Sequence, residues 1–171
     1  TAPESGHFGG AGLDLPSLNH MHEALGDFVD ASLSPDLQLE LDHEDRCPEE
    51  IVRAMSDPET LGVQMVFVPE AYGGMDGGAF DSYRICEVMA RHDIGLATAV
   101  FATFLGSDPI MVGGTEEQKQ DWLGAISEQG TVFAYGATEP EAGSDLGAMT
   151  TVAEPITDDD ATIAAALEDV S

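Results

Sequence analysis

The side chains best suited to chemistry lie in one polar, glycine-containing stretch late in the sequence. Residues 135–145 read YGATEPEAGSD, with hydroxyl groups at Thr138 and Ser144. Hydroxyls, and backbone amides that glycine leaves accessible, can donate hydrogen bonds to a phosphate or to a ring that gains negative charge. Turn chemistry offers a simpler interpretation, in which residues 139–140 and 143–145 only reverse the chain. On residue types alone, the simple turn is the favoured interpretation.

The histidines and cysteines form no comparable pattern. His20 and His22 are two residues apart, so they would face different sides of a helix and make poor joint ligands. We therefore expect no metal site. Cys47 and Cys86 are not arranged as Cys-x-x-Cys, and we expect both to be reduced and structural, as in a cytosolic protein.

The charge restricts the partners of this chain. Thirty-three acidic residues face five basic ones, which gives a formal net charge of −28. We expect neither nucleic acid nor a membrane as a partner, because phosphates are bound by lysine and arginine and an anionic surface would repel this chain. The acidity fits a surface adapted to concentrated salt or an unusually acidic cytosolic protein. The sequence shows no long uninterrupted apolar run and no basic, apolar leader, so we expect a cytoplasmic protein without a membrane span.

Most of the chain before the polar stretch has the apolar spacing of helices. Apolar residues follow a helical period from Leu18 to Leu33, and we expect Pro35 to end that helix. Trp122 is expected in the core. A charged loop is predicted over residues 42–46. Further helices are predicted to start at Pro48 and after residues 57–58. Residues 81–91 and the apolar stretch at 94–105 are each predicted to form a helix, and the second of these is expected to be central. A last helix is predicted to begin with a capping box at residues 115–118.

Strand-like patterns appear only after Gly130. Residues 131–135 and 150–153 are rich in β-branched and aromatic side chains, which favours two short strands. Helices followed by strands predict a mainly α fold, with a helical domain before an incomplete β domain. We expect a flexible arm over residues 1–17, the helical domain over 18–130 and the start of the β domain over 131–171.

Three motifs, taken in order, resemble the acyl-CoA dehydrogenase family. VPEAYGG at residues 68–74 is similar to the family's V-P-E-x-Y-G-G turn, and GTEEQK at 114–119 is similar to one of its helix starts. YGATEPEAGSD at 135–145 is similar to the family signature Y-x-x-T-E-P-x-A-G-S-D. The likeness covers roughly residues 18–153, and three motifs in the right order make coincidence improbable.

This resemblance implies a noncovalent FAD site and oxidation of the Cα–Cβ bond of an acyl-CoA to trans-2-enoyl-CoA. It further implies an electron-transferring flavoprotein as the acceptor and a homodimer or homotetramer. By matched position, Tyr135, Ala137 and Thr138 would line the flavin, and Thr138 would bond to its ring. Gly143 and Ser144 would lie by the flavin and the acyl-CoA, with Ser144 touching both cofactor and substrate. The resemblance thus favours the ligand-binding interpretation of the polar stretch.

The resemblance is incomplete, because family members continue through a full β domain and a second helical domain. The second helical domain carries the family's catalytic glutamate, so we expect these 171 residues alone to be inert. A non-catalytic helical interaction module, or a subunit completed by another chain, is an alternative. An acyl-CoA oxidase or a flavin monooxygenase of the same fold is a second alternative.

Overall fold

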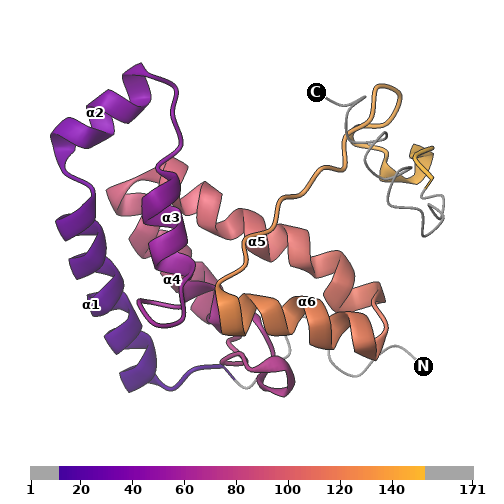
Figure 1. Cartoon of the computed structure of the whole chain (residues 1–171), viewed down its shortest axis with the longest axis horizontal. Helices are drawn as coiled ribbons and strands as arrows, with labels where there is room; N and C mark the ends of the chain where they lie inside the picture. The colour runs from indigo at the N-terminus through magenta and orange to yellow at the C-terminus, as the bar shows by residue number, and fades with distance from the viewer. Residues whose placement is uncertain (1–11, 153–171) are drawn as a thin grey trace, which may run out of the picture. The chain divides into compact units, whose positions relative to one another are not determined.

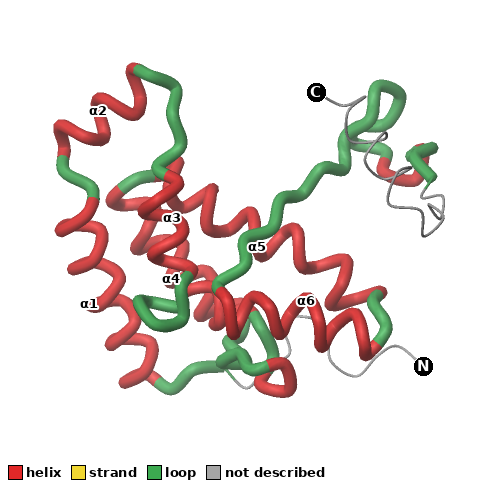
Figure 2. The backbone as a smooth tube through the Cα atoms, in the orientation of Figure 1, coloured by secondary structure: helices red, strands yellow, loops and turns green. Residues whose placement is uncertain are grey.

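The structure is a computed structural model that describes residues 12–152, which belong to two compact units. The first unit ends at Tyr135 and the second begins at Gly136. The described part contains helices and turns but no β-strand (Figures 1 and 2). The first unit contains α1 (Leu15–Ser32), α2 (Pro35–His43), α3 (Glu49–Ser56), the 3-10 turns η1 (Val63–Phe67) and η2 (Glu70–Tyr72), α4 (Ala79–His92), α5 (Ile94–Gly113) and α6 (Glu116–Gln129). The second unit contains the 3-10 turn η3 (Leu146–Ala148).

A large apolar core holds α1, α3, α4 and α5 together, and a smaller cluster of Val68, Leu123 and Ile126 packs α6. Helix α1 packs against α4, α4 against α5, and α5 against both α3 and α6 (Figure 1). The fully buried side chains of this core include Leu25 of α1, Met55 of α3, Ile85 and Met89 of α4, and Leu96 and Val100 of α5. Because burial of apolar surface is the main favourable term in folding, this core stabilises the unit. The mainly α fold expected from the sequence is confirmed.

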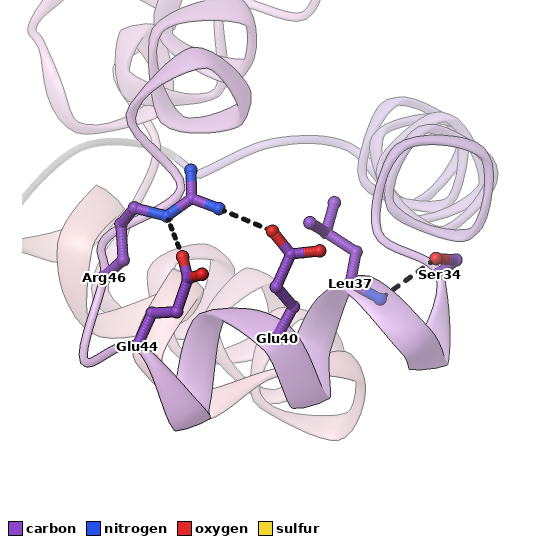
Figure 3. Close-up of polar contacts among 5 residues, drawn as sticks. All are labelled: Ser34, Leu37, Glu40, Glu44 and Arg46. Atoms are coloured by element: carbon purple, nitrogen blue, oxygen red, sulfur yellow. Dashed lines mark hydrogen bonds and ion pairs between the residues drawn. The ribbon is translucent and has the colours of Figure 1, made fainter.

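Helix α2 corrects the sequence-based view of the region around Pro35. The proline stands at the first position of a new helix, where its missing amide hydrogen costs nothing. The Ser34 hydroxyl caps this helix by accepting a hydrogen bond from the Leu37 amide at 3.2 Å (Figure 3). The helix includes residues 42 and 43, which were expected in a charged loop, so the loop starts only at Glu44. Arg46 forms ion pairs of 3.0 Å with Glu44 and Glu40 at the carboxy-terminal end of α2 (Figure 3).

Helix α5 is the central element of the helical unit, and it is longer than expected. It continues past the predicted end at residue 105 and through Pro109 to Gly113. Its inward side includes the buried Thr103 as well as apolar residues. Ile94 and Val112, however, are 75% and 74% exposed. By length and composition, α5 is the one helix in residues 12–152 that could cross a membrane, a test that core helices also pass.

Two of the motifs fix local turns and the start of α6. The capping box is confirmed, because the Thr115 amide donates to Gln118 Oε1 at 2.9 Å and the Gln118 amide to Thr115 Oγ1 at 3.2 Å.

In the VPEAYGG motif, a Cβ on Gly74 would lie 1.9 Å from the Val68 carbonyl oxygen, so only glycine fits. The Tyr72 hydroxyl donates to Glu116 Oε2 at 3.0 Å. Desolvation is the larger cause that raises the pKa of Tyr72, and the hydrogen bond and charge of Glu116 raise it further. The motif is therefore a structural turn, as expected.

Candidate functional site

The polar signature forms a tight loop within the second unit. The Glu139 amide donates to the Ala142 carbonyl oxygen at 2.8 Å, and the Ala142 amide donates back to the Glu139 carbonyl oxygen at 3.2 Å. The Ala142 side chain is 2% exposed. The predicted chain reversal is thus present, and it brings Pro140 to the tip of the turn.

The side chain of Glu139 fastens this loop to the residues that follow it. One carboxylate oxygen accepts hydrogen bonds from the Thr150 amide at 2.8 Å and the Thr150 hydroxyl at 3.2 Å. The other accepts from the Thr151 amide at 2.9 Å. These donors favour the ionised form, the Thr150 amide most strongly, and lower the pKa of Glu139 to about 2. We call Glu139, Thr150 and Thr151 the signature clasp.

The residues expected to hold the flavin are accessible in this loop. Thr138, Gly143 and Ser144 are exposed, and Ala137 is half-buried. Within residues 12–152, neither the Thr138 nor the Ser144 hydroxyl forms a hydrogen bond to another residue. A Cβ placed on Gly143 would meet no atom within 4 Å. Free hydroxyls and open backbone fit a ligand with ring carbonyls or phosphates, and a flavin nucleotide has both.

Tyr135 belongs to the first unit, and the segment that carries it is not a strand. Residues 131–135 were expected to form a strand, yet they pair with no other segment in the described part of the chain. A strand requires a neighbour to bond its amides, and here the Phe133 amide instead donates to Thr103 Oγ1 at 3.0 Å. The Tyr135 side chain is 50% exposed, so its ring is available to a ligand.

Two other expectations from the sequence need correction. Residues 150–152 were placed in a second strand, but Thr150 and Thr151 are donors of the signature clasp. Residue 153 lies outside the described residues. Trp122 was expected in the core, but it is 51% exposed, with its ring edge-on to Phe133 at 6.1 Å between ring centroids.

Sequence reasoning missed the role of Glu139. The clasp joins residues eleven and twelve positions apart, whereas the local side-chain to backbone patterns readable from sequence span two to four residues. The available signal was weak: a carboxylate in the turn, followed by two adjacent threonines beyond it.

No metal-binding group is found within residues 12–152. The described histidine, cysteine, aspartate and glutamate side chains form no cluster of three or more that could hold an ion. Cys47 is exposed and Cys86 is half-buried, and both are free thiols.

Comparison with known proteins identifies the helical unit. The family model described as "Acyl-CoA dehydrogenase, N-terminal domain" matches residues 16–129, which are α1 through α6. The chain therefore belongs to the acyl-CoA dehydrogenase family and contains its amino-terminal domain.

Several relatives show the extent of the similarity. The chain is 35% identical over 131 residues to "Acyl-CoA dehydrogenase, short-chain specific" of Megasphaera elsdenii, covering 74% of this chain and 33% of that protein. It is 29% identical over 152 residues to "Probable acyl-CoA dehydrogenase FadE25" of Mycobacterium tuberculosis, covering 87% and 38%. The chain thus spans about a third of the length of the curated relatives that it matches.

A solved structure is similar over the same region. A chain of "Electron transferring flavoprotein of Acidaminococcus fermentans: Towards a mechanism of flavin-based electron bifurcation" is 29% identical, with a TM-score of 0.72. The match covers 86% of the present chain and 38% of that one. The fold is therefore shared with a part of that chain.

Proposed function

We propose that this chain is the amino-terminal part of an FAD-dependent acyl-CoA dehydrogenase. The proposed reaction oxidises the Cα–Cβ bond of an acyl-CoA thioester to a trans-2-enoyl-CoA and passes the electrons to an electron-transferring flavoprotein. Membership of the family and the names of the relatives support this proposal. We further propose a cytoplasmic homodimer or homotetramer, and we expect the 171 residues by themselves to be inert.

One observation carries the cofactor assignment: the signature loop presents two free hydroxyls beside open backbone. Thr138 and Ser144 are exposed, and neither hydroxyl is engaged by a residue of the described part. A loop built only to reverse the chain has no need of free donors, since turn hydroxyls usually bond to their own backbone. The signature clasp holds the loop closed without using either hydroxyl.

The residues of this chain would act by binding and orienting. A bound flavin would supply the hydride acceptor of the reaction. The Thr138 hydroxyl would donate a hydrogen bond to the ring, and Ser144 would contact both ring and thioester substrate. Tyr135, Ala137 and Gly143 would line the ring. Donors near the ring carbonyls favour the negative charge that reduction creates, so these contacts stabilise the reduced state.

The test is flavin binding by the complete protein, purified and assayed with a set of acyl-CoA thioesters. We expect bound FAD, enoyl-CoA as the product and reduction of an electron-transferring flavoprotein. Thr138→Val should weaken FAD binding about tenfold, the effect of losing one good hydrogen bond. Thr98→Val is the matched control, because this exposed hydroxyl bonds only to the Ile94 carbonyl of its own helix at 2.8 Å.

Other outcomes identify the alternatives. A colourless complete protein that binds no added FAD contradicts the proposal and favours a helical interaction module. Hydrogen peroxide formed in step with enoyl-CoA would instead indicate an acyl-CoA oxidase.

A further inference from the structure

The segment that leads from α6 to Tyr135 lies against the surface of α5. It begins at Gly130, whose left-handed backbone (φ 63°) ends α6 and whose Cβ, if present, would lie 2.6 Å from the Ser56 carbonyl oxygen of α3. The Thr131 amide then donates to the Ala125 carbonyl oxygen at 3.3 Å. The start of the segment is therefore fixed by packing against α3 and by the last turn of α6.

Two residues one turn apart on α5 receive the next part of the segment. Thr103 Oγ1 accepts the Phe133 amide at 3.0 Å, and Thr103 is 1% exposed. At Gly106, a Cβ would lie 2.7 Å from Phe133 Cβ and 2.8 Å from the Ala134 carbonyl oxygen. The glycine thus permits a backbone approach that any larger residue would block. We call Thr103 and Gly106 the α5 cradle.

The buried side chain of Gln64 forms a hydrogen bond with the α5 cradle. Gln64 belongs to η1, is 0% exposed, and its Nε2 donates to Thr103 Oγ1 at 3.1 Å. The same hydroxyl oxygen therefore accepts one bond from a buried amide and one from the segment backbone. On the other side, the exposed Trp122 ring packs edge-on against Phe133. Buried polar contacts of this kind are costly when broken, because a partner is left unsatisfied.

We propose that Thr103 and Gly106, supported by Gln64, are positioning residues for the flavin site, because they hold the backbone that presents Tyr135. This inference rests on the proposed function, in which Tyr135 lines the flavin. None of the three is proposed to touch the cofactor. Their effect is to fix residues 133 and 134, which directly precede Tyr135, against α5 before the flavin binds, and this lowers the ordering cost of binding.

One disruptive substitution at each residue of the α5 cradle, made in the complete protein, tests the inference. Thr103→Val removes the hydroxyl at nearly constant volume, and Thr103→Ser retains it. Gly106→Ala adds a methyl group that must displace the segment, although alanine favours the helix itself. Gly113→Ala is the matched control, because a Cβ on this α5 glycine would meet nothing within 4 Å.

We expect Thr103→Val and Gly106→Ala each to raise the dissociation constant of FAD about tenfold. Both should also change the visible circular dichroism of the bound flavin and speed hydrogen exchange at the Phe133 amide. Thr103→Ser should restore all three readouts, and Gly113→Ala should leave them as in the wild type. Gly106→Ala remains informative if Thr103→Val fails to fold, because its displacement of the segment removes no buried hydrogen-bonding group.

The failures of the two proposals are distinguishable. A wild-type protein that binds no FAD overturns the proposed function. Wild-type flavin affinity and spectrum in Gly106→Ala and Thr103→Val, together with faster exchange at Phe133, overturn the positioning role alone. Unchanged exchange at Phe133 in both variants shows that the cradle does not hold the segment, and it overturns the inference as well.

Discussion

At the level of single residues, Glu139 shows how one carboxylate can fix the shape of a loop. It accepts three hydrogen bonds from Thr150 and Thr151 across a gap of eleven and twelve residues. Two of the donors are backbone amides, which cannot move away without opening the loop. The contribution of Glu139 is therefore to the shape of the loop that displays Thr138 and Ser144.

The pKa of Glu139 gives a direct prediction. Because the folded pKa is lowered from 4.5 to about 2, the clasp contributes its full stability above about pH 4.5 and loses it as the pH falls through about 2. We expect Glu139→Gln to weaken the clasp at neutral pH, since a neutral amide accepts hydrogen bonds less strongly. Hydrogen exchange at the Thr150 and Thr151 amides should rise.

The control for the clasp is Glu141→Gln, which removes an exposed carboxylate from the same loop. Exchange at Thr150 and Thr151 should stay at its wild-type rate in this variant. Equal exchange rates in wild type and Glu139→Gln would show that the clasp does not hold the loop.

At the level of elements, helix starts marked by a local cap were predictable, but the helix expected after residues 57–58 is absent: a turn at residues 58–61 leads into the 3-10 turn η1. The capping box at Thr115 and the helix that follows it agree with expectation, because both groups of the box lie three residues apart in the sequence. Helix α2 was missed because Pro35 was interpreted only as a helix terminator, although Ser34 followed by proline is also a start signal.

Removal of the capping box provides the prediction at this scale. Thr115→Ala should lower the free energy of unfolding by about 1 kcal/mol, because the amide of Gln118 loses its acceptor. Denaturant unfolding of the complete protein, followed by circular dichroism, measures this change. Thr115→Ser keeps the hydroxyl and should retain most of the stability. A serine variant as unstable as the alanine variant would assign the effect to something other than the cap.

At the scale of the whole molecule, charge is the dominant feature. Four of the five basic side chains, Arg46, Arg84, Arg91 and Lys119, already form ion pairs of 2.7 to 3.5 Å. They can offset few of the 33 acidic residues. The remaining carboxylates repel one another, and this repulsion favours an expanded chain.

Salt should therefore stabilise the fold. Raising the ionic strength from about 0.1 M to about 1 M shortens the screening length from about 10 Å to about 3 Å, and the repulsion falls accordingly. We expect the melting temperature of the complete protein to rise steadily over this range with potassium chloride. A related acyl-CoA dehydrogenase with a balanced charge serves as the control. Equal salt responses of the two proteins would contradict a role for the acidic surface.

Several short-range features could be read from the amino-acid sequence: the helical period, the capping box at Thr115, the VPEAYGG turn and the location of the signature loop. These features depend on residues within a few positions of one another, so local chemistry is sufficient to specify them. Its three motifs also indicated the family that the comparison then established.

The groups that satisfy the backbone of residues 131–135, by contrast, depend on long-range packing. Residues 131–135 have strand-like side chains, but the Phe133 amide found the hydroxyl of Thr103, thirty residues away. Likewise, Gln64 is a polar residue in an apolar segment, and its partner became evident only when η1 packed on α5. Most backbone and buried polar groups are paired in a folded protein, and the identity of a distant partner depends on the packing of the whole unit.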